Sequence, residues 1–496
     1  MVQTLADSWG RPQEVSRLDL LQTDLILQAA ELQPNASGAS LKPLLLDGKG
    51  AEVYDQALQR HQEARSTNLR VNAELTALAK NSNAQRAELI QSRRRTNQDN
   101  IQQLELRIGI LQAQLGRRSE AIATWEQVAN CQGNFDSICI EATPTRWSIT
   151  ARILQGLWSE PVAILPDAET QIRQALDGWF RDRALQQLYV PQQRTESLLE
   201  LQSQTQVAAE SAMGRLAIVN SVTIIGGLLG IIVWLALGVQ RFLFPDKSPF
   251  SPKSSPREWP VNWPGETTWE VMILWVTSFV AISQVVLPIA LQRLGIVPTS
   301  SWSFRDQAML VLIPYLFSMA PMLPILSFSL QRFTPLPKPW FRFEIFPLSW
   351  LRWGILGYVV AVPLVVIVSL LSQQLLQGQG GGNPLLPILV ESQDSVAKLI
   401  LWVTVAIAAP FFEELLFRGF LLPSLTKLTS FWPAIAISGF LFALAHLNLA
   451  DILPLTVLGM VLGFVYMRSG NLLAPMLLHG LWNSGSFLAL LALGGK

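Results

Sequence analysis

The placement of charged residues restricts the fold of this chain more than any other feature of its sequence. Most charged residues precede Arg215, and beyond that position long apolar runs alternate with short polar loops. A helix needs about 20 apolar residues to cross a bilayer. Eight apolar segments beyond Arg215 predict about eight transmembrane helices, with 452–467 the shortest. These segments are 216–240, 271–292, 307–331, 353–390, 399–424, 431–450, 452–467 and 471–493.

The first 214 residues have a different character and predict a soluble helical domain. Apolar residues from Ile101 to Leu115 recur every three or four positions, which is the spacing of one helix face. Gly116, Ala121 and Trp125 follow with the spacing of the second half of a tetratricopeptide-type hairpin. That resemblance covers one unit, whereas a stack of such units needs about three. The domain is therefore expected to be an ordinary helical domain with a coiled stretch. A domain that is tetratricopeptide-like in part and binds a protein partner is the alternative.

The whole chain is predicted to be all-α, with a polytopic transmembrane helix bundle after the soluble domain. The predicted boundaries are 1–214 for the soluble domain, 215–395 for the first four spans and their loops, and 396–496 for a core of four spans. Such a chain is an integral, multi-pass protein that contacts the lipid bilayer of a bacterial plasma membrane or an internal membrane. Its net charge of +1 gives no excess of positive charge that would attract nucleic acid, so no nucleic-acid partner is expected.

Three features of the soluble domain lead to further expectations. Lys and Arg are concentrated in the loops after the first span and before the fourth, which predicts that these loops are cytoplasmic and the soluble domain is not. Cys131 and Cys139 form either one short-loop disulfide, in an oxidising compartment, or two free thiols. His61 lies in the charged stretch LQRHQEA and is expected at the surface.

The stretch PFFEELLFRG, residues 410–419, places three charged side chains inside an apolar segment. Charges at membrane depth cost about 3 kcal/mol each on insertion scales, so they need a structural or functional reason. Glu413 lies fifteen residues from Lys398 and fourteen from Lys427, which puts it near the middle of the span. Glu414 and Arg418 are four residues apart and can pair on one helix face, whereas Glu413 has no partner in its own helix.

His446, His479 and Asn483 add polar groups to the segments that follow. Each alone could simply form hydrogen bonds between helices. Together with Glu413 they suit the hydrolysis of an amide, since a carboxylate and an imidazole can deprotonate a water while a second imidazole and an amide stabilise an oxyanion. Two histidines and a glutamate also match a zinc ligand set, but the sequence lacks His-Glu-x-x-His, so no metal cofactor is expected.

Three motifs, EELLFR, FALAH and HGLWN, resemble those of the CAAX protease and bacteriocin-processing family of intramembrane glutamic endopeptidases. This family includes type II, Ras-converting-enzyme type prenyl proteases and lysostaphin-resistance-like proteins. Its pattern is two glutamates and an arginine, then phenylalanine four residues before a histidine, then histidine four residues before an asparagine. The resemblance covers about residues 397–493. The matching residues are Glu413, Glu414, Arg418, Phe442, His446, His479 and Asn483.

The resemblance implies an intramembrane endopeptidase that cleaves a membrane-anchored protein or peptide, as in the maturation of CAAX-box proteins. It implies that Glu413 and His446 activate the water and that His479 and Asn483 form the oxyanion hole. The same resemblance gives Glu414, Arg418 and Phe442 supporting roles. Two other classes stay open: a non-enzymatic membrane immunity, assembly or scaffold protein that binds partners through its N-terminal domain, and a transporter or proton carrier.

Overall fold

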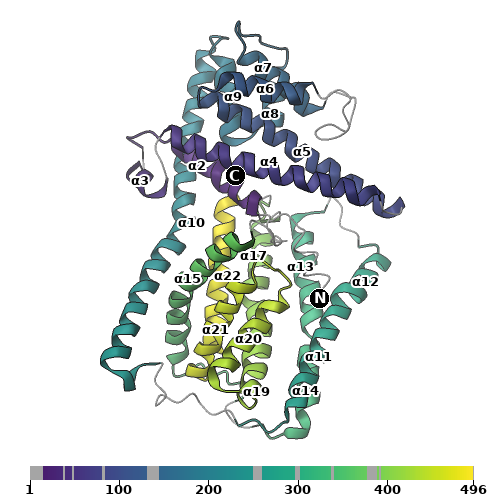
Figure 1. The fold of residues 1–496 in the computed structure, drawn as a ribbon, viewed down its shortest axis with the longest axis vertical. Coiled ribbons are helices and arrows are strands. Elements are labelled where there is room, and N and C mark those ends of the chain that lie inside the picture. Colours follow the sequence, from purple (N-terminus) through teal and green to yellow (C-terminus); the bar gives the residue numbers. More distant parts are fainter. Residues whose placement is uncertain are drawn as a thin grey trace. The chain divides into compact units, whose positions relative to one another are not determined.

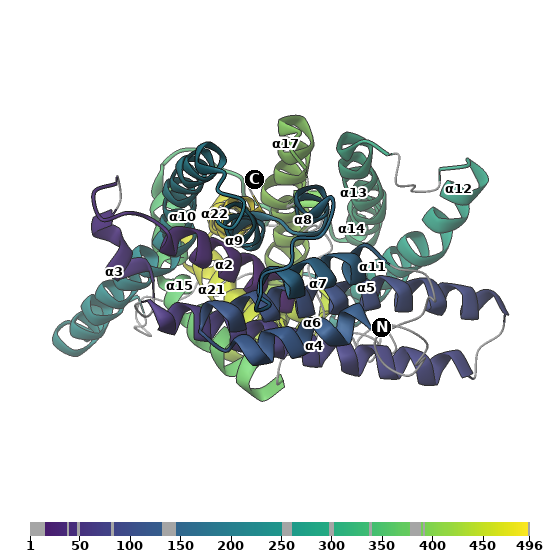
Figure 2. The same ribbon diagram turned by 90° about the horizontal axis from the view of Figure 1, so that it is seen from above.

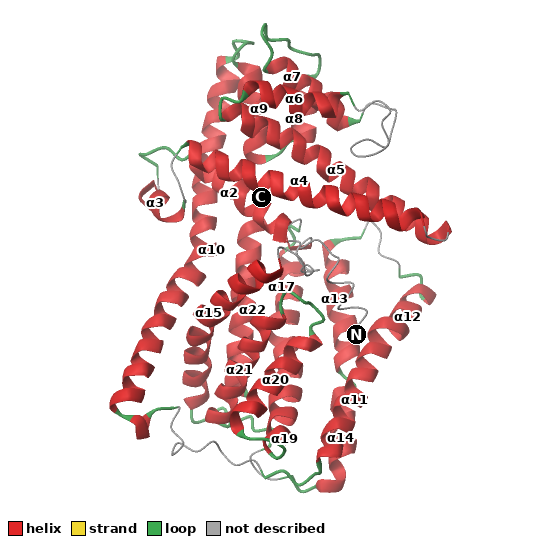
Figure 3. Ribbon diagram, in the orientation of Figure 1, coloured by secondary structure: helices red, strands yellow, loops and turns green. Residues whose placement is uncertain are grey.

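The structure is a computed structural model, and every regular element within the residues it describes is a helix (Figure 3). An all-α fold was predicted from the sequence and is confirmed. The described residues are 15–36, 39–46, 50–80, 84–130, 145–249, 260–296, 302–336, 340–376, 388–389 and 392–494. Cys131 and Cys139 lie outside these ranges. The chain divides into two compact units, Pro12–Ile218 and Val219–Lys496, and each is described here by itself.

The N-terminal unit is built from helices of very unequal length (Figure 1). Two long helices, α4 and α5, pack side by side, and the shorter helices α6 and α7 follow them (Figure 2). The elements are α2 Val15–Ala30, η1 Ala39–Leu41, α3 Lys42–Leu45, α4 Ala51–Lys80, α5 Ala84–Gln114, α6 Arg118–Ala129, α7 Arg146–Leu157, α8 Ala168–Ala175, α9 Gly178–Tyr189 and the first part of α10 Thr195–Leu243.

Trp125 organises the hairpin of α5 and α6. Its indole is fully buried against Gly109, where a Cβ would overlap the ring, and Trp125 Nε1 donates a hydrogen bond to the Leu106 carbonyl at 3.2 Å. The close approach of α5 and α6 therefore depends on glycine at position 109, since any side chain there would displace the indole.

His61 is fully buried, and the expectation that it lies at the surface is wrong. Its Nδ1 donates to the Ala57 carbonyl at 2.8 Å, and its ring meets the edge of Phe180. The charged neighbours of His61 in the sequence misled the prediction, because residues next to each other on a helix point to different faces. Burial, with a smaller contribution from the positive charge of Arg107, lowers the pKa of His61 to about 3.

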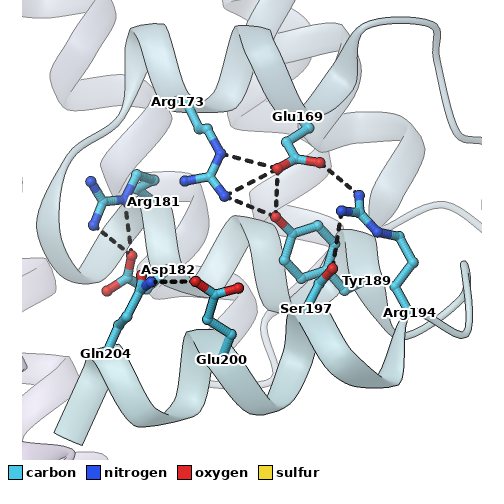
Figure 4. Close-up of polar contacts among 9 residues, drawn as sticks. All are labelled: Glu169, Arg173, Arg181, Asp182, Tyr189, Arg194, Ser197, Glu200 and Gln204. Carbon is cyan, nitrogen blue, oxygen red and sulfur yellow. Dashed lines mark hydrogen bonds and ion pairs between the residues drawn. The ribbon is translucent and has the colours of Figure 1, made fainter.

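A cluster of ion pairs joins α8, α9 and the start of α10 (Figure 4). Glu169 accepts hydrogen bonds from Arg194 at 2.6 Å, from the Tyr189 hydroxyl at 2.7 Å and from Arg173 at 3.1 Å. Burial alone would raise the pKa of Glu169, but the hydrogen bonds from Arg194, Tyr189 and Arg173 outweigh it and lower the pKa to about 2. Both carboxylate oxygens of Glu169 are therefore occupied by partners from its own unit.

In the described residues, seven helical segments are long and apolar enough to cross a membrane, and the protein is an integral membrane protein. They are Thr195–Leu243, Gly265–Arg293, Phe304–Phe333, Ser349–Leu376, Ser395–Thr426, Ile452–Ser469 and Leu473–Gly494. The segment predicted at 431–450 instead forms a shorter helix, α20, of 15 residues from Phe431 to Ala445. It ends there because a loop follows in which Leu447 adopts a positive φ of 55°.

Several spans are composed of consecutive helical pieces. The elements of this unit, after the second part of α10, are η2 Pro245–Lys247, α11 Gly265–Ala281, η3 Ile282–Val286, α12 Leu287–Arg293, α13 Phe304–Met319, α14 Met322–Leu330, η4 Gln331–Phe333, α15 Ser349–Leu376, α17 Ser395–Val403, η5 Thr404–Ala408, α18 Ala409–Glu414, η6 Leu415–Leu421, α19 Leu422–Thr426, α20 Phe431–Ala445, α21 Ile452–Ser469 and α22 Leu473–Gly494.

Glycine lets the helices around the motif residues approach closely. A Cβ on Gly459 of α21 would lie 2.7 Å from the Cα of Gly439 in α20, which is closer than atoms can pack. On α22, a Cβ on Gly480 would lie 2.7 Å from the Ala406 carbonyl oxygen in η5. Small residues at such contacts are typical of helix packing in membranes. They bring α20, α21, α22 and η5 close enough for short side chains to reach from one backbone to the next.

Candidate active site

The span that carries Glu413 and Glu414 contains two π-helical segments, η5 and η6, on either side of the short helix α18. A proline, Pro410, lies two residues after the end of η5, and Pro423 lies two residues after the end of η6. Proline has no N–H and cannot donate to the preceding turn, so a widened turn is one way to accommodate it. The glutamates therefore lie in a span whose ordinary helical hydrogen bonding is interrupted.

Asn483 compensates for one of these interruptions. In the π-helical register of η5, the Ala409 N–H bonds to the Thr404 carbonyl. The next bond in that register would link the Val405 carbonyl to the missing N–H of Pro410. The Asn483 side chain takes this place, since its Nδ2 donates to the Val405 oxygen at 2.7 Å. One of the two amide hydrogens of Asn483 is thus committed to holding α22 against η5.

Glu414 and Arg418 form a fully buried ion pair. Arg418 Nη1 donates to Glu414 Oε1 at 2.8 Å, and Nη2 donates to the Gly459 carbonyl on α21 at 3.0 Å. The guanidinium also lies over the ring of Phe442 on α20, 4.5 Å from its centroid. Arg418 therefore joins three helices, as expected for a charge that must be satisfied inside the bundle.

His479 is oriented by Glu414. Its Nδ1 lies 2.8 Å from Glu414 Oε1, so the N–H is on Nδ1 and donates to the carboxylate. The other nitrogen, Nε2, faces Glu413 at 4.0 Å from Oε2. The same carboxylate thus pairs with Arg418 and fixes the direction in which His479 presents its second nitrogen.

His446 is oriented by the backbone of its own helix. Its Nδ1 donates to the Phe442 carbonyl at 2.9 Å, which leaves Nε2 to face Glu413 Oε2 at 3.8 Å. The ring of Phe442 packs against both imidazoles, with centroid distances of 4.8 Å to His446 and 5.6 Å to His479. Phe442 therefore acts as a common wall that limits the movement of both histidines.

Glu413 Oε2 is buried and completes no hydrogen bond within the described residues. Separations of 3.8 and 4.0 Å from the two imidazole Nε2 atoms are too long for direct hydrogen bonds. They are suited to a bridging water, which would lie about 2.8 Å from each of the atoms it joins. The three side chains thus converge on a point where a small polar molecule fits.

The predicted site residues are brought together around this point. Glu413, His446 and His479 face one another. Phe442 contacts both histidines, Glu414 contacts His479, and Arg418 contacts Glu414 and Phe442. Asn483 lies one turn from His479 on α22. Among the described residues, no three histidine, cysteine, aspartate or glutamate side chains are arranged to hold a metal ion.

The sequence analysis missed two neighbours of this cluster. Tyr315 of α13 interacts with Glu413, and Asp451, just before α21, interacts with His446. Burial raises the pKa of the Asp451 carboxyl, while the positive charge that His446 can carry acts in the opposite sense. A signal for Tyr315 was present: a phenol hydroxyl inside a predicted span, 307–331, needs a polar neighbour when it is buried.

Comparison with known proteins agrees with this arrangement of motifs. Residues 395–485 match the family model described as Type II CAAX prenyl endopeptidase Rce1-like. The chain belongs to this family. It does so through its C-terminal region, which contains all seven predicted site residues. Membership implies a peptidase that acts on a protein substrate.

Two bacterial relatives also match. YdiL of Bacillus subtilis (strain 168), named as a candidate membrane peptidase, is 30% identical over 79 residues. That match covers 16% of this chain and about a third (32%) of the length of YdiL. The UPF0177 protein YxdF of Lactococcus lactis subsp. lactis (strain IL1403) is 31% identical over 157 residues, which is 31% of this chain and 82% of YxdF. No solved structure matches the chain.

Proposed function

We propose that the protein is an intramembrane endopeptidase that hydrolyses a peptide bond in a membrane-associated protein, with Glu413 as the general base. The observation that carries this proposal is the convergence of the Nε2 atoms of His446 and His479 on the unsatisfied Glu413 Oε2. A water in this position can give its proton to the carboxylate and attack a carbonyl carbon. His446 holds the same water from the other side.

His479 and Asn483 are proposed to stabilise the oxyanion. Glu414 holds His479 through Nδ1 and directs Nε2 toward Glu413, and an Nε2 that carries a hydrogen donates to the developing oxyanion. Asn483 retains one amide hydrogen after its bond to the Val405 carbonyl and can supply a second donor.

The proposal is tested by mapping the substrates in cells. Membrane proteins from cells with the wild-type chain and from cells with Glu413→Gln are compared for the positions of their C-termini. We expect a set of proteins to be shortened in the wild type and full-length in the variant. Glu270→Gln, a change of the same kind at an exposed carboxylate paired with Arg332, is the matched control and should behave as the wild type. Identical C-termini in all three strains would contradict the proposal.

A second candidate function is a non-enzymatic scaffold or assembly protein. The bonds of Asn483 to Val405 and of His479 to Glu414 favour it, because both side chains join helices and would be useful without catalysis. Complementation of a deletion strain separates the two functions. A scaffold predicts that Glu413→Gln restores the lost phenotype, whereas a peptidase predicts that it does not.

A further inference from the structure

Tyr315 of α13 is a polar residue beside the Glu413 cluster, and it lies outside the range that matches the family model. Helix α13 packs beside α17 in both ribbon views and also contacts η5, one turn before Glu413 (Figures 1 and 2). This packing brings Tyr315 to the candidate site from a span that carries none of the three motifs.

The Tyr315 hydroxyl and Glu413 Oε2 are two buried polar atoms, and neither completes a hydrogen bond within the described residues. The two groups nevertheless lie near enough to interact as donor and acceptor. Buried polar groups in proteins almost always have partners, and exceptions are concentrated at functional sites. A phenol can donate and an ionised carboxylate can only accept, so the two groups are chemically matched.

Tyr315 also lines a cavity of about 370 Å³ between α13 and the span formed by α11, η3 and α12. Most of the wall of this cavity is apolar, including Phe279, Leu287, Leu310 and Pro314. Tyr315 therefore lies between the apolar cavity and the Glu413 cluster. Its ring packs against the apolar neighbours, and its hydroxyl can interact with Glu413. A phenylalanine would fill the same apolar position, so the hydroxyl is not needed for packing.

On the basis of the proposed function, we infer that Tyr315 is a positioning residue whose hydroxyl donates to the Glu413 carboxylate and holds it between the imidazoles of His446 and His479. The donor keeps Glu413 Oε2 directed at the place of the attacking water. Tyr315 acts through Glu413 and does not itself touch the reacting atoms.

The test is Tyr315→Phe, which removes one oxygen atom and keeps the ring. The full chain in proteoliposomes is assayed with a quenched-fluorescent peptide that ends in a farnesylated cysteine and three further residues. We expect kcat to fall about tenfold, the usual effect of losing one hydrogen bond in a transition state, with KM unchanged.

Tyr358→Phe is the matched control, since Tyr358 is another tyrosine of the membrane unit and packs its ring on Trp482. It should leave both kcat and KM unchanged. The unfolding temperature of Tyr315→Phe should change little, because the ring is kept and packs among the same apolar neighbours. A lower unfolding temperature with an unchanged kcat would show a merely structural role and overturn the inference.

Glu413→Gln in the same assay separates this inference from the proposed function. Loss of cleavage in Glu413→Gln with wild-type kcat and KM in Tyr315→Phe would overturn only the role of Tyr315. Retained cleavage in Glu413→Gln would overturn the proposed function itself.

Discussion

Glu169 in the N-terminal unit and Glu413 in the membrane unit both lie among cationic or titratable side chains. They differ in hydrogen bonding, because both oxygens of Glu169 have partners and Oε2 of Glu413 has none within the described residues. Glu169 uses both oxygens to accept bonds from two arginines and a tyrosine (Figure 4). Glu413 faces two imidazoles at 3.8 and 4.0 Å, and its Oε2 forms no hydrogen bond within the described residues. The difference is one of hydrogen bonding: the first carboxylate is held by its own unit, whereas Oε2 of the second faces two imidazoles without bonding to either.

The largest expected effect is the loss of cleavage in Glu413→Gln. Removing the general base should lower kcat by about a thousandfold, within the range usual for acid–base catalysis. The unfolding temperature should stay constant or rise, since an unsatisfied buried charge is removed. The measurement is cleavage and thermal unfolding on one preparation of the full chain. A loss of stability with cleavage retained would make Glu413 resemble Glu169 and contradict the comparison.

Glu414→Gln should lower stability much more than Glu413→Gln does, although the two glutamates are neighbours in the sequence. This change leaves Arg418 buried without a counter-charge and weakens the bond to His479, so we expect a loss of about 3–5 kcal/mol in the free energy of unfolding. Unfolding in detergent, followed by the exposure of buried tryptophans, measures the effect. A stability equal to that of Glu413→Gln would contradict the distinction between the two carboxylates.

The burial of His61 in the N-terminal unit predicts that the free energy of unfolding falls by about 2 kcal/mol between pH 7 and pH 5. The pKa of His61 is about 3 in the folded state and 6.5 in the unfolded chain. The stability that the neutral imidazole contributes is therefore present above pH 6.5 and is lost as the pH falls toward 3. Burial raises the pKa of Asp24 to about 6, against the opposing effect of Arg107, and changes stability in the opposite sense over part of this range.

His61→Gln isolates the histidine from Asp24. Hydrogen exchange of α4 is measured at pH 7 and at pH 5. Between these two values the wild type should lose about 2 kcal/mol more protection than this variant. Equal changes in both chains would contradict the low pKa of His61.

Glu169→Gln should have the smallest effect, a loss of about 1–2 kcal/mol confined to α8, α9 and the start of α10. The arginines it binds are 48% and 41% exposed, so water can replace part of what is lost. Hydrogen exchange of these helices measures the change, and cleavage by the full chain should stay at the wild-type rate. A loss of cleavage comparable to that in Glu413→Gln would remove the contrast between the two clusters.

The sequence was sufficient to predict the all-α class and to select the residues that converge on Glu413. Charges in an apolar span are costly, so Glu413, Glu414 and Arg418 stood out without any structure. The pairing of Glu414 with Arg418 followed from their spacing of four residues, and the structure contains it. Partners from other helices could not be predicted in this way, because spacing along one helix says nothing about its neighbours.

The π-helical turns explain much of what the sequence analysis missed. Pro410 and Pro423 mark them in the sequence, but which carbonyl is left free depends on the register of each turn. The bond from Asn483 to the Val405 carbonyl follows from that register and had no local signal. Tyr315 was missed for a different reason: it lies about a hundred residues before Glu413 and meets it only through the packing of α13.

The most direct test of the central claim is a paired assay of Glu413→Gln and Glu270→Gln in proteoliposomes with the farnesylated peptide. We predict that Glu413→Gln loses cleavage and keeps its unfolding temperature, while Glu270→Gln keeps both. Cleavage by Glu413→Gln at the rate of Glu270→Gln would contradict the claim that Glu413 activates the water.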